Sequence, residues 1–368
     1  LLHSVLVLER RIGLYSWVII LSILTFTMSV VGTFLVRSGI LNSVHTFAND
    51  PSRGLFILSF LALMVFSSIF IFFKYAPDDN KNYKIFSKES FILVNNWFMI
   101  FFLAVVLIGT LYPVFLDTLT GQKISVGPPY YNFILAPFLL PLLFLMTSGP
   151  KHKWISSNVI GIFNIALFTS IILFFVIFLS TKEGGLLLLL ILLFSTYLIT
   201  QTTFDFYETF KNKNINLSRI ISHFGFGLLI LSISLNQIFS VEKSFNARLG
   251  DEKNFLNYTI KFNNLETFSK NNFKSVKGHF EIIDKKNITS QNLTPEIRVY
   301  NQPETITYEA SINTKLFSDT YLTMSNISNT DIFNIKFQKK PFMNFIWFSV
   351  LLISFGGILQ FLRFEKKV

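Results

Sequence analysis

The chain has 368 residues, of which 51% are hydrophobic and 14% charged, and its formal net charge is +11. Soluble globular domains carry roughly a quarter charged residues, so this composition excludes an ordinary soluble enzyme and indicates repeated membrane-spanning helices. The basic residues flank apolar runs, which favours membrane lipid over nucleic acid as their partner. Because the chain has no cysteine, its own side chains cannot supply a disulfide, a thiolate ligand to a metal or a haem-attachment motif.

Apolar runs long enough to cross a hydrocarbon core, which needs about 20 residues, recur along the chain. Residues 1–8 are too few to span, and we interpret them as the end of a truncated transmembrane helix. The sequence predicts an α-helical polytopic membrane protein with about eight transmembrane helices and a partial one. A membrane domain is expected at 9–239, and the last helix with a cytoplasmic tail at 342–368. The expected runs are 14–36, 54–75, 91–112, 131–149, 158–180, 184–204, 217–239 and 343–362.

One polar stretch, 240–341, separates the seventh run from the eighth. Lysine and arginine crowd the loops on one side of the predicted membrane, which assigns that side to the cytoplasm and the polar stretch to the periplasm. Polar and apolar residues alternate at 258–262, 297–300 and 305–308, as is typical of half-buried strands. The sequence therefore predicts one β-rich periplasmic domain between the last two helices.

Two of the five histidines fall inside predicted helices at similar depth. At 1.5 Å per residue, His223 lies roughly 6 Å and His3 roughly 10 Å from the cytoplasmic boundary. Ionisable side chains are costly inside a bilayer and are functional candidates there. Two imidazoles on antiparallel helices could ligate one haem iron, although each could equally well hydrogen-bond a neighbouring helix. Gly225 and Gly227 would let either a flat macrocycle or another helix approach closely.

A third histidine, His45, lies in an outer loop between Arg37 and Arg53. The two arginines could pair with carboxylates such as haem propionates, and the alternative is an ordinary surface loop. Asp50 followed by Pro51 is expected to cap the next helix.

The remaining candidates have structural interpretations. His152 stands between two lysines and is expected to be solvated, and His279 is expected to be structural. Tyr130 and Tyr131 could stack on a ligand or form part of an interfacial aromatic belt.

Residues 32–51, which read GTFLVRSGILNSVHTFANDP, closely resemble the signature of the CcmF family of cytochrome c maturation proteins. Other motifs resemble the family in the same order along the chain. They are Leu2-His3-Ser4, the outer-loop run GQKISVGPPYYN at 121–132, Ser222-His223-Phe224-Gly225, and Glu309-Ala310 followed by Asp319-Thr320-Tyr321. The resemblance covers essentially the whole chain and indicates the C-terminal part of the family's proteins. The Trp-rich segment that precedes it in the family has no counterpart here.

The resemblance implies a set of haem-binding residues. His3 and His223 would be axial ligands of a resident haem b, and His45 would ligate a second haem that is the transferred substrate. The metal would in each case be the haem iron. Arg37, Arg53, Tyr130 and Tyr131 would be further contacts at the site.

The resemblance also implies a haem lyase of the holocytochrome c synthase type in a bacterial inner membrane, with the mitochondrial inner membrane as the organellar alternative. Haem would arrive from a periplasmic haem chaperone and be attached by thioether bonds to the C-x-x-C-H motif of apocytochrome c. Thiol-oxidoreductase and apocytochrome-binding subunits would be further partners, and the resident haem b would act as reductant. No catalytic side chain is expected, because the attacking thiols belong to the substrate. The alternatives are a membrane haem transporter and a non-catalytic scaffold of the maturation complex.

Overall fold

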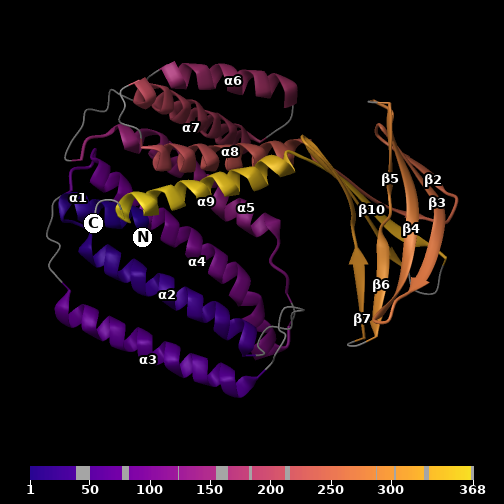
Figure 1. Cartoon of the computed structure of the whole chain (residues 1–368), viewed down its shortest axis with the longest axis horizontal. Helices are drawn as coiled ribbons and strands as arrows, with labels where there is room; N and C mark the ends of the chain where they lie inside the picture. Colours follow the sequence, from indigo (N-terminus) through magenta and orange to yellow (C-terminus); the bar gives the residue numbers. More distant parts are fainter. Residues whose placement is uncertain are drawn as a thin grey trace. The chain divides into compact units, whose positions relative to one another are not determined.

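The computed structural model describes residues 1–38, 50–76, 83–122, 124–154, 165–181, 185–211, 216–286, 288–301, 304–326 and 331–365. These residues form two compact units, Leu1–Phe168 and Thr169–Val368. Figure 1 labels the helices α1–α9 and most of the strands.

The described residues of the first unit include the helices α1 (Leu2–Arg11), α2 (Tyr15–Arg37), α3 (Pro51–Tyr75), α4 (Lys88–Thr120) and α5 (Pro128–Ser148). The predicted cap of α3 is confirmed, since the Asp50 side chain accepts from the backbone N–H groups of Ser52 and Arg53, with Pro51 in the first turn. The α4 helix continues past the apolar run expected at 91–112. It ends where Gly121 adopts a left-handed conformation, φ 70°, which glycine tolerates.

The second unit contains most of α6 (Ile165–Thr181) together with α7 (Leu186–Lys211), α8 (Leu217–Phe239) and α9 (Met343–Glu365). The expected run 158–180 corresponds to α6, whose described part begins at Ile165. In the described part of the chain, seven helices are long and apolar enough to cross a membrane. They are α2, α3, α4, α5, α7, α8 and α9.

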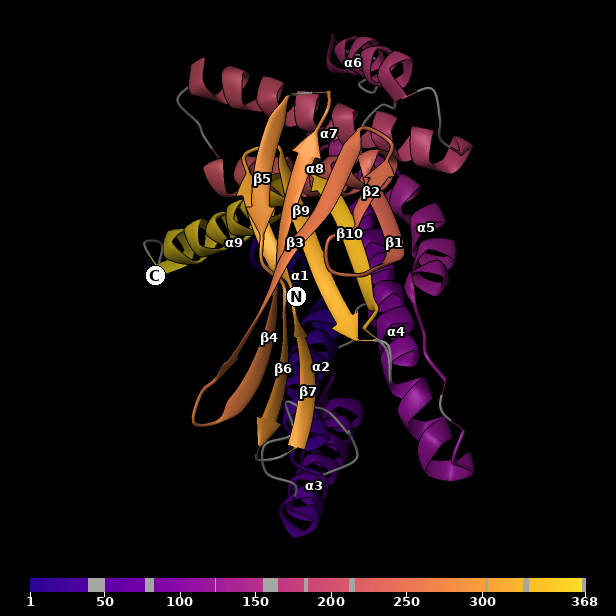
Figure 2. The same ribbon diagram turned by 90° about the vertical axis from the view of Figure 1, so that its right-hand side faces the viewer.

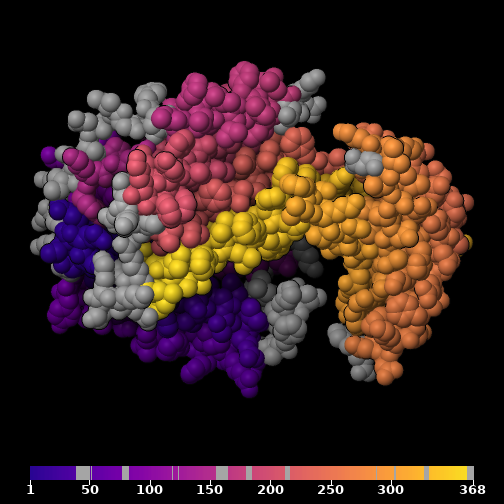
Figure 3. Space-filling view, turned by 45° about the horizontal axis from the view of Figure 1, so that its top comes forward, coloured from indigo at the N-terminus to yellow at the C-terminus, as the bar shows by residue number. Residues whose placement is uncertain are grey.

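Glycines bring α8 and α9 into close contact (Figure 1). A Cβ atom on Gly225 would lie 3.1 Å from the backbone nitrogen of Ile353 on α9. Two turns earlier on α8, the Ser218 hydroxyl donates a hydrogen bond of 2.7 Å to the carbonyl of Gly356. Gly227 instead faces α7. Both glycines of α8 therefore accommodate neighbouring helices. Figure 3 shows α9 along the surface of the molecule.

A β-sandwich separates α8 from α9 in the sequence, as predicted. One sheet has the order β1-β10-β9-β8, and the other has the order β2-β3-β4-β6-β7 with β5 paired to β4. The strands are β1 Val241–Ala247, β2 Glu252–Phe255, β3 Tyr258–Ser269, β4 Phe273–Asp284, β5 Thr289–Leu293, β6 Glu296–Asn301, β7 Glu304–Glu309, β8 Ser311–Lys315, β9 Ser318–Asn326 and β10 Phe333–Pro341. The three predicted strand segments lie in β3, β6 and β7. In Figure 2 the strands face the viewer.

Apolar side chains from both sheets form one core. Phe262 on β3 and Phe280 on β4 stack with ring centroids 4.3 Å apart, and both are 2% exposed. Leu322 and Met324 on β9 and Phe337 on β10 cover them from the other sheet and are fully buried. Strands β3, β4, β9 and β10 contribute alternate residues to this core, which is why the polar-apolar alternation at 258–262 revealed β3 in the sequence.

The sandwich is tied to the helix pair where the chain leaves and returns. Strand β1 follows α8, strand β10 precedes α9, and the two are antiparallel neighbours with Val241 opposite Lys339. The Asn236 side chain near the end of α8 donates a 2.5 Å hydrogen bond to the carbonyl of Pro341. The Asn344 amide on α9 donates to the carbonyl of Lys315 at 2.9 Å.

Substitution of Gly356 tests the close packing of α8 and α9. A Cβ atom there would meet the Ser222 hydroxyl and would lie 2.9 Å from the carbonyl of Ser218, a backbone atom that cannot rotate away. Gly356→Ala is therefore expected to lower the free energy of unfolding by about 1–3 kcal/mol, the usual cost of overpacking. The matched control is Gly357→Ala, where nothing lies within 4 Å. Equal thermal unfolding temperatures of the two variants in detergent would contradict this packing.

Candidate functional site

The α1 helix, which carries His3, is fixed to α4 by two polar contacts. The Asn96 amide donates a 2.8 Å hydrogen bond to the Ser4 hydroxyl, and both side chains are buried. One end of α1 is held by the Arg11 guanidinium, whose Nε lies 2.8 Å from a carboxylate oxygen of Glu89. These contacts set the rotation of α1 about its axis. They leave His3, next to Ser4, on an exposed face.

His223 lies on the side of α8 that faces α7. Arg219, His223 and Gly227 recur at four-residue spacing and so share one face of the helix. Arg219 contacts Asp205 of α7, and Gly227 packs on α7 as well. His223, between them, is half-buried. His3 and His223 belong to different units, so the common site expected for them stays a prediction.

The sequence predicts that His3 and His223 bind a haem, and the structure gives their exposure and surroundings. Both imidazoles are at least partly accessible in the structure. Across the described residues, no three or more His, Asp or Glu side chains gather as they would around a bare metal ion. Imidazole nitrogens are common axial ligands of a haem iron, so each of these side chains has the chemistry that the predicted ligation needs. His3 and His223 are the residues that would hold it.

His45 lies outside the described residues. On either side of the undescribed segment, the Asp50 N–H donates to the carbonyl of Arg37 at 3.3 Å. Hydrogen bonds from the Ser52 hydroxyl and from the Arg53 backbone hold the pKa of the Asp50 carboxyl below its usual value. The Arg53 Nε lies 3.1 Å from the same carboxylate. Arg37 and Arg53 are exposed at one end of the α2–α3 pair, and their role toward a haem remains a prediction.

Tyr130 and Tyr131 pack α5 against α4. A Cβ atom on Gly109 of α4 would lie 2.7 Å from the Tyr131 hydroxyl and 2.8 Å from the Tyr130 ring. The Tyr130 hydroxyl donates to the carbonyl of Val105 at 3.3 Å, and the two rings meet edge to face at 5.1 Å. The absence of a side chain at Gly109 is what admits the tyrosines. Their predicted contact with a haem is not tested by this packing.

The expectation of a solvated His152 is wrong. The side chain is 7% exposed and meets the Phe91 ring edge to face, with centroids 4.6 Å apart. The reason is a tertiary contact, since the N–H of Lys88 donates to the carbonyl of Lys153 at 3.0 Å and folds the loop against the start of α4. Burial lowers the pKa of His152, and the charge of Lys88 lowers it further.

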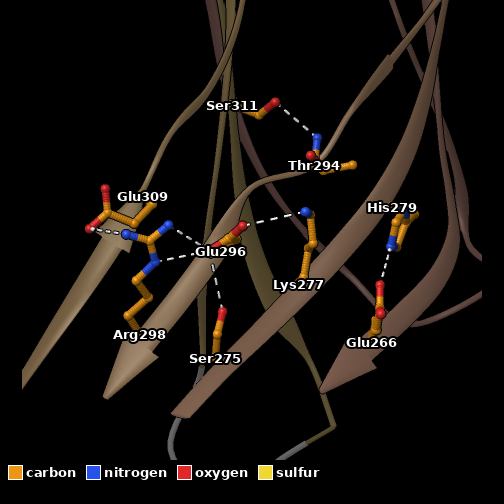
Figure 4. A network of polar contacts seen from close by, with 9 residues as sticks. All are labelled: Glu266, Ser275, Lys277, His279, Thr294, Glu296, Arg298, Glu309 and Ser311. Atoms are coloured by element: carbon orange, nitrogen blue, oxygen red, sulfur yellow. Dashed lines mark hydrogen bonds and ion pairs between the residues drawn. The ribbon is translucent and has the colours of Figure 1, made fainter. Parts of the chain in front are cut away.

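An ion-pair network that the sequence did not reveal covers part of the sandwich (Figure 4). Glu296 on β6 lies directly opposite Glu309 on β7, and the two like charges are bridged by Arg298, at 2.8 Å from Glu296 and 3.9 Å from Glu309. Lys277 of β4 is 3.5 Å from Glu296. Partial burial opposes ionisation of Glu296, but Arg298 and Lys277 outweigh it, so the pKa of Glu296 lies below its usual value.

His279 lies beside this network and pairs with Glu266, Nε2 to carboxylate oxygen 3.2 Å (Figure 4). The pair joins β4 to β3. This contact agrees with a structural interpretation of His279.

Asp319 at the start of β9 is the least satisfied carboxyl group of the described sandwich. It is 5% exposed, and its Oδ2 accepts from the Tyr321 hydroxyl at 3.3 Å. Its Oδ1 is buried without a hydrogen-bond partner among the described residues. Burial raises the pKa of Asp319 and so favours the neutral acid.

Known proteins resemble this chain along its whole length. Residues 238–341 match the family described as CcmF C-terminal beta-sandwich. The chain is 31% identical to the cytochrome c-type biogenesis protein CcmF of Pseudomonas aeruginosa and 29% identical to that of Escherichia coli. All of this chain is covered in each case, with 58% and 59% of the relatives. A solved structure, Cytochrome c Heme Lyase CcmF, matches with a TM-score of 0.73 at 16% identity, over 97% of this chain and 56% of that chain.

The fold defines a polytopic helical protein with a β-sandwich inserted before its last helix. The chain is similar to the CcmF proteins over its whole length, and the resemblance predicted from its motifs is confirmed. It spans less than two thirds of the length of the curated relatives named above.

The buried contact between Asn96 and Ser4 can be tested by removing one partner. Asn96→Ala leaves the Ser4 hydroxyl buried without its donor, which should cost about 1–3 kcal/mol of stability. The matched control is Asn95→Ala, because Asn95 is its half-buried neighbour on α4. Thermal unfolding in detergent should separate the two variants, and equal unfolding temperatures would show that the α1 contact contributes little.

Asp319→Asn should change how stability depends on pH. The folded state disfavours the ionised carboxylate, so wild type carries a penalty that is absent below the ordinary Asp pKa of about 3.9 and grows as pH rises through the folded value. The variant has no such penalty, so its stability relative to wild type should increase from pH 4 to pH 7. Asp331→Asn, which removes an exposed carboxylate from the same sandwich, is the control. Hydrogen exchange of the sandwich strands measures the effect, and a stability difference independent of pH would contradict it.

Proposed function

We propose that the chain is part of a haem lyase that attaches haem to apocytochrome c at a bacterial inner membrane. The single observation that carries the proposal is the similarity to CcmF proteins over the whole chain, with the CcmF sandwich between α8 and α9. The seven helices able to cross a membrane in the described part of the chain support a multi-pass location.

His3 and His223 are proposed as the axial ligands of a resident haem b. When bound, such a haem supplies one-electron transfer without loss of either ligand, and so can act as the reductant for the substrate haem. The protein's part is to present the two imidazoles. Asn96 and Glu89 fix α1, and the packing of Gly227 on α7 fixes the face of α8 that carries His223.

The substrate haem is proposed to bind His45, with its propionates near Arg37 and Arg53. Each cysteine thiol of the C-x-x-C-H motif adds across a vinyl group, so that a C–S bond forms and the thiol hydrogen goes to the other vinyl carbon. No atom leaves and no nucleophile is needed from this chain, whose contribution is to hold and orient the reactants. Tyr130 and Tyr131 are proposed as further contacts at this site.

The proposal implies partners on the periplasmic side. They are a haem chaperone that delivers the substrate, apocytochrome c, and the thiol-oxidoreductase and apocytochrome-binding subunits of a maturation complex. The sandwich offers them a charged surface ordered by the Glu296–Arg298 network (Figure 4).

Visible spectra test the resident haem. Protein purified from haem-replete membranes should show a b-type α-band in the reduced-minus-oxidised spectrum, because two imidazoles ligate the iron. His3→Ala and His223→Ala should each weaken that band. His279→Ala, whose imidazole pairs with Glu266 on the sandwich, should leave it unchanged. A wild-type protein without haem would remove the cofactor from the proposal and favour a scaffold role. A band that survives both substitutions would place the ligands elsewhere.

A further inference from the structure

A charged cluster joins α7 to α8 one helical turn from His223. Both carboxylate oxygens of Asp205 are engaged, since Oδ1 accepts from the Gln201 amide at 2.7 Å and Oδ2 lies 3.1 Å from Nη2 of Arg219. Gln201 is 2% exposed, and the Asp205 and Arg219 side chains are 12% and 27% exposed. An ion pair shielded to this degree is costly unless its geometry is fixed. The cluster therefore holds the guanidinium in one place on the α7 side of α8.

That place lies beside the predicted ligand of the resident haem. Arg219 precedes His223 by four residues, so both lie on one face of α8 with their Cα atoms about 6 Å apart along the helix axis. Arg219 is also the nearer of the two to the start of α8 at Leu217. It therefore lies on the side of His223 that faces the predicted membrane boundary.

The guanidinium can bind more than one carboxylate. It carries five N–H donors in a planar fork that suits bidentate carboxylate recognition. Asp205 is the carboxylate that contacts it in the described part of the chain, through one of its terminal nitrogens. A haem bound through His223 carries two propionates on one edge, and these anions favour the polar boundary over the apolar interior.

We propose that Arg219 binds a propionate of the haem held by His223, and that Asp205 and Gln201 position the guanidinium for it. This inference rests on the proposed resident haem. Arg219 is therefore a different residue from Arg37 and Arg53, the two arginines that the sequence analysis assigned to propionates, which lie on α2 and α3.

Redox titration of the bound haem tests the role of Arg219. Reduction adds one negative charge to the haem, so a nearby cation raises the midpoint potential and a nearby anion lowers it. Arg219→Gln should lower the potential and Asp205→Asn should raise it. The matched control is Lys211→Gln, which removes the same charge from an exposed residue at the end of α7 and should leave the potential near the wild-type value.

Replacing the haem by its dimethyl ester distinguishes a contact between Arg219 and a propionate from the electrostatic effect of the Arg219 charge on the haem iron. The ester carries no propionate charge, so the difference between wild type and Arg219→Gln should shrink when both proteins hold it. A difference of the same size with both haems would overturn the proposal. So would an unchanged potential in Arg219→Gln, which would indicate a structural role.

Haem retention provides a second measurement if Arg219→Gln loses the cofactor. Recovery of haem and of potential in Arg219→Lys would support a charge contact, and loss in both variants would overturn it. Absence of haem from the wild-type protein would instead defeat the proposed resident site itself. The two failures are therefore distinguishable.

Discussion

The helical part of this molecule depends on one constraint, which is that polar groups within apolar helices must find their partners inside the protein. Water cannot hydrogen-bond to them inside a bilayer, so each such group forms a hydrogen bond or ion pair with a neighbouring protein group. Asn96 donates a hydrogen bond to Ser4 and so attaches the ten-residue α1 to α4. Asp205 engages Gln201 on its own helix and Arg219 on α8, and so fixes how α7 and α8 face one another. The two histidines proposed to ligate haem are carried by the helices that these contacts orient.

The sandwich is subject to a different constraint, because its first and last strands are continuous with two closely packed helices. Small residues let α8 and α9 approach until Ser218 hydrogen-bonds the backbone of Gly356. The strands that continue these helices, β1 and β10, are then already neighbours. Side-chain amides at the junction, Asn236 and Asn344, bond carbonyl groups where regular structure changes from helix to strand. The sandwich is in this way a continuation of the helix pair.

Local signals in the sequence predicted most of the architecture. The apolar run at 217–239 matches α8, the Asp50–Pro51 cap is present, and the alternation at 258–262 marks β3. Contacts between residues distant in the sequence could not be predicted from these local patterns. His152 is buried because Lys88 and Lys153 join through their backbones, and no pattern near His152 indicates this. Both halves of the Asp205–Arg219 pair are visible as charges at helix ends, but their pairing depends on how two helices pack. Gly225 and Gly227 admitted two interpretations in the sequence, and the structure uses both for helix contacts.

The adjacency of β1 and β10 also constrains the order in which the protein can be made. Among the described strands of its sheet, β1 pairs with β10 alone, and the register joins Val241 to Lys339, residues far apart in the chain. During synthesis β1 emerges with an unsatisfied edge and must wait until nearly the whole insertion has been produced. Closure of this sheet therefore coincides with the arrival of α9. Folding of the sandwich and insertion of the last helix thus become consecutive steps of one biogenesis event, in which the first strand made is among the last to find its ladder partner.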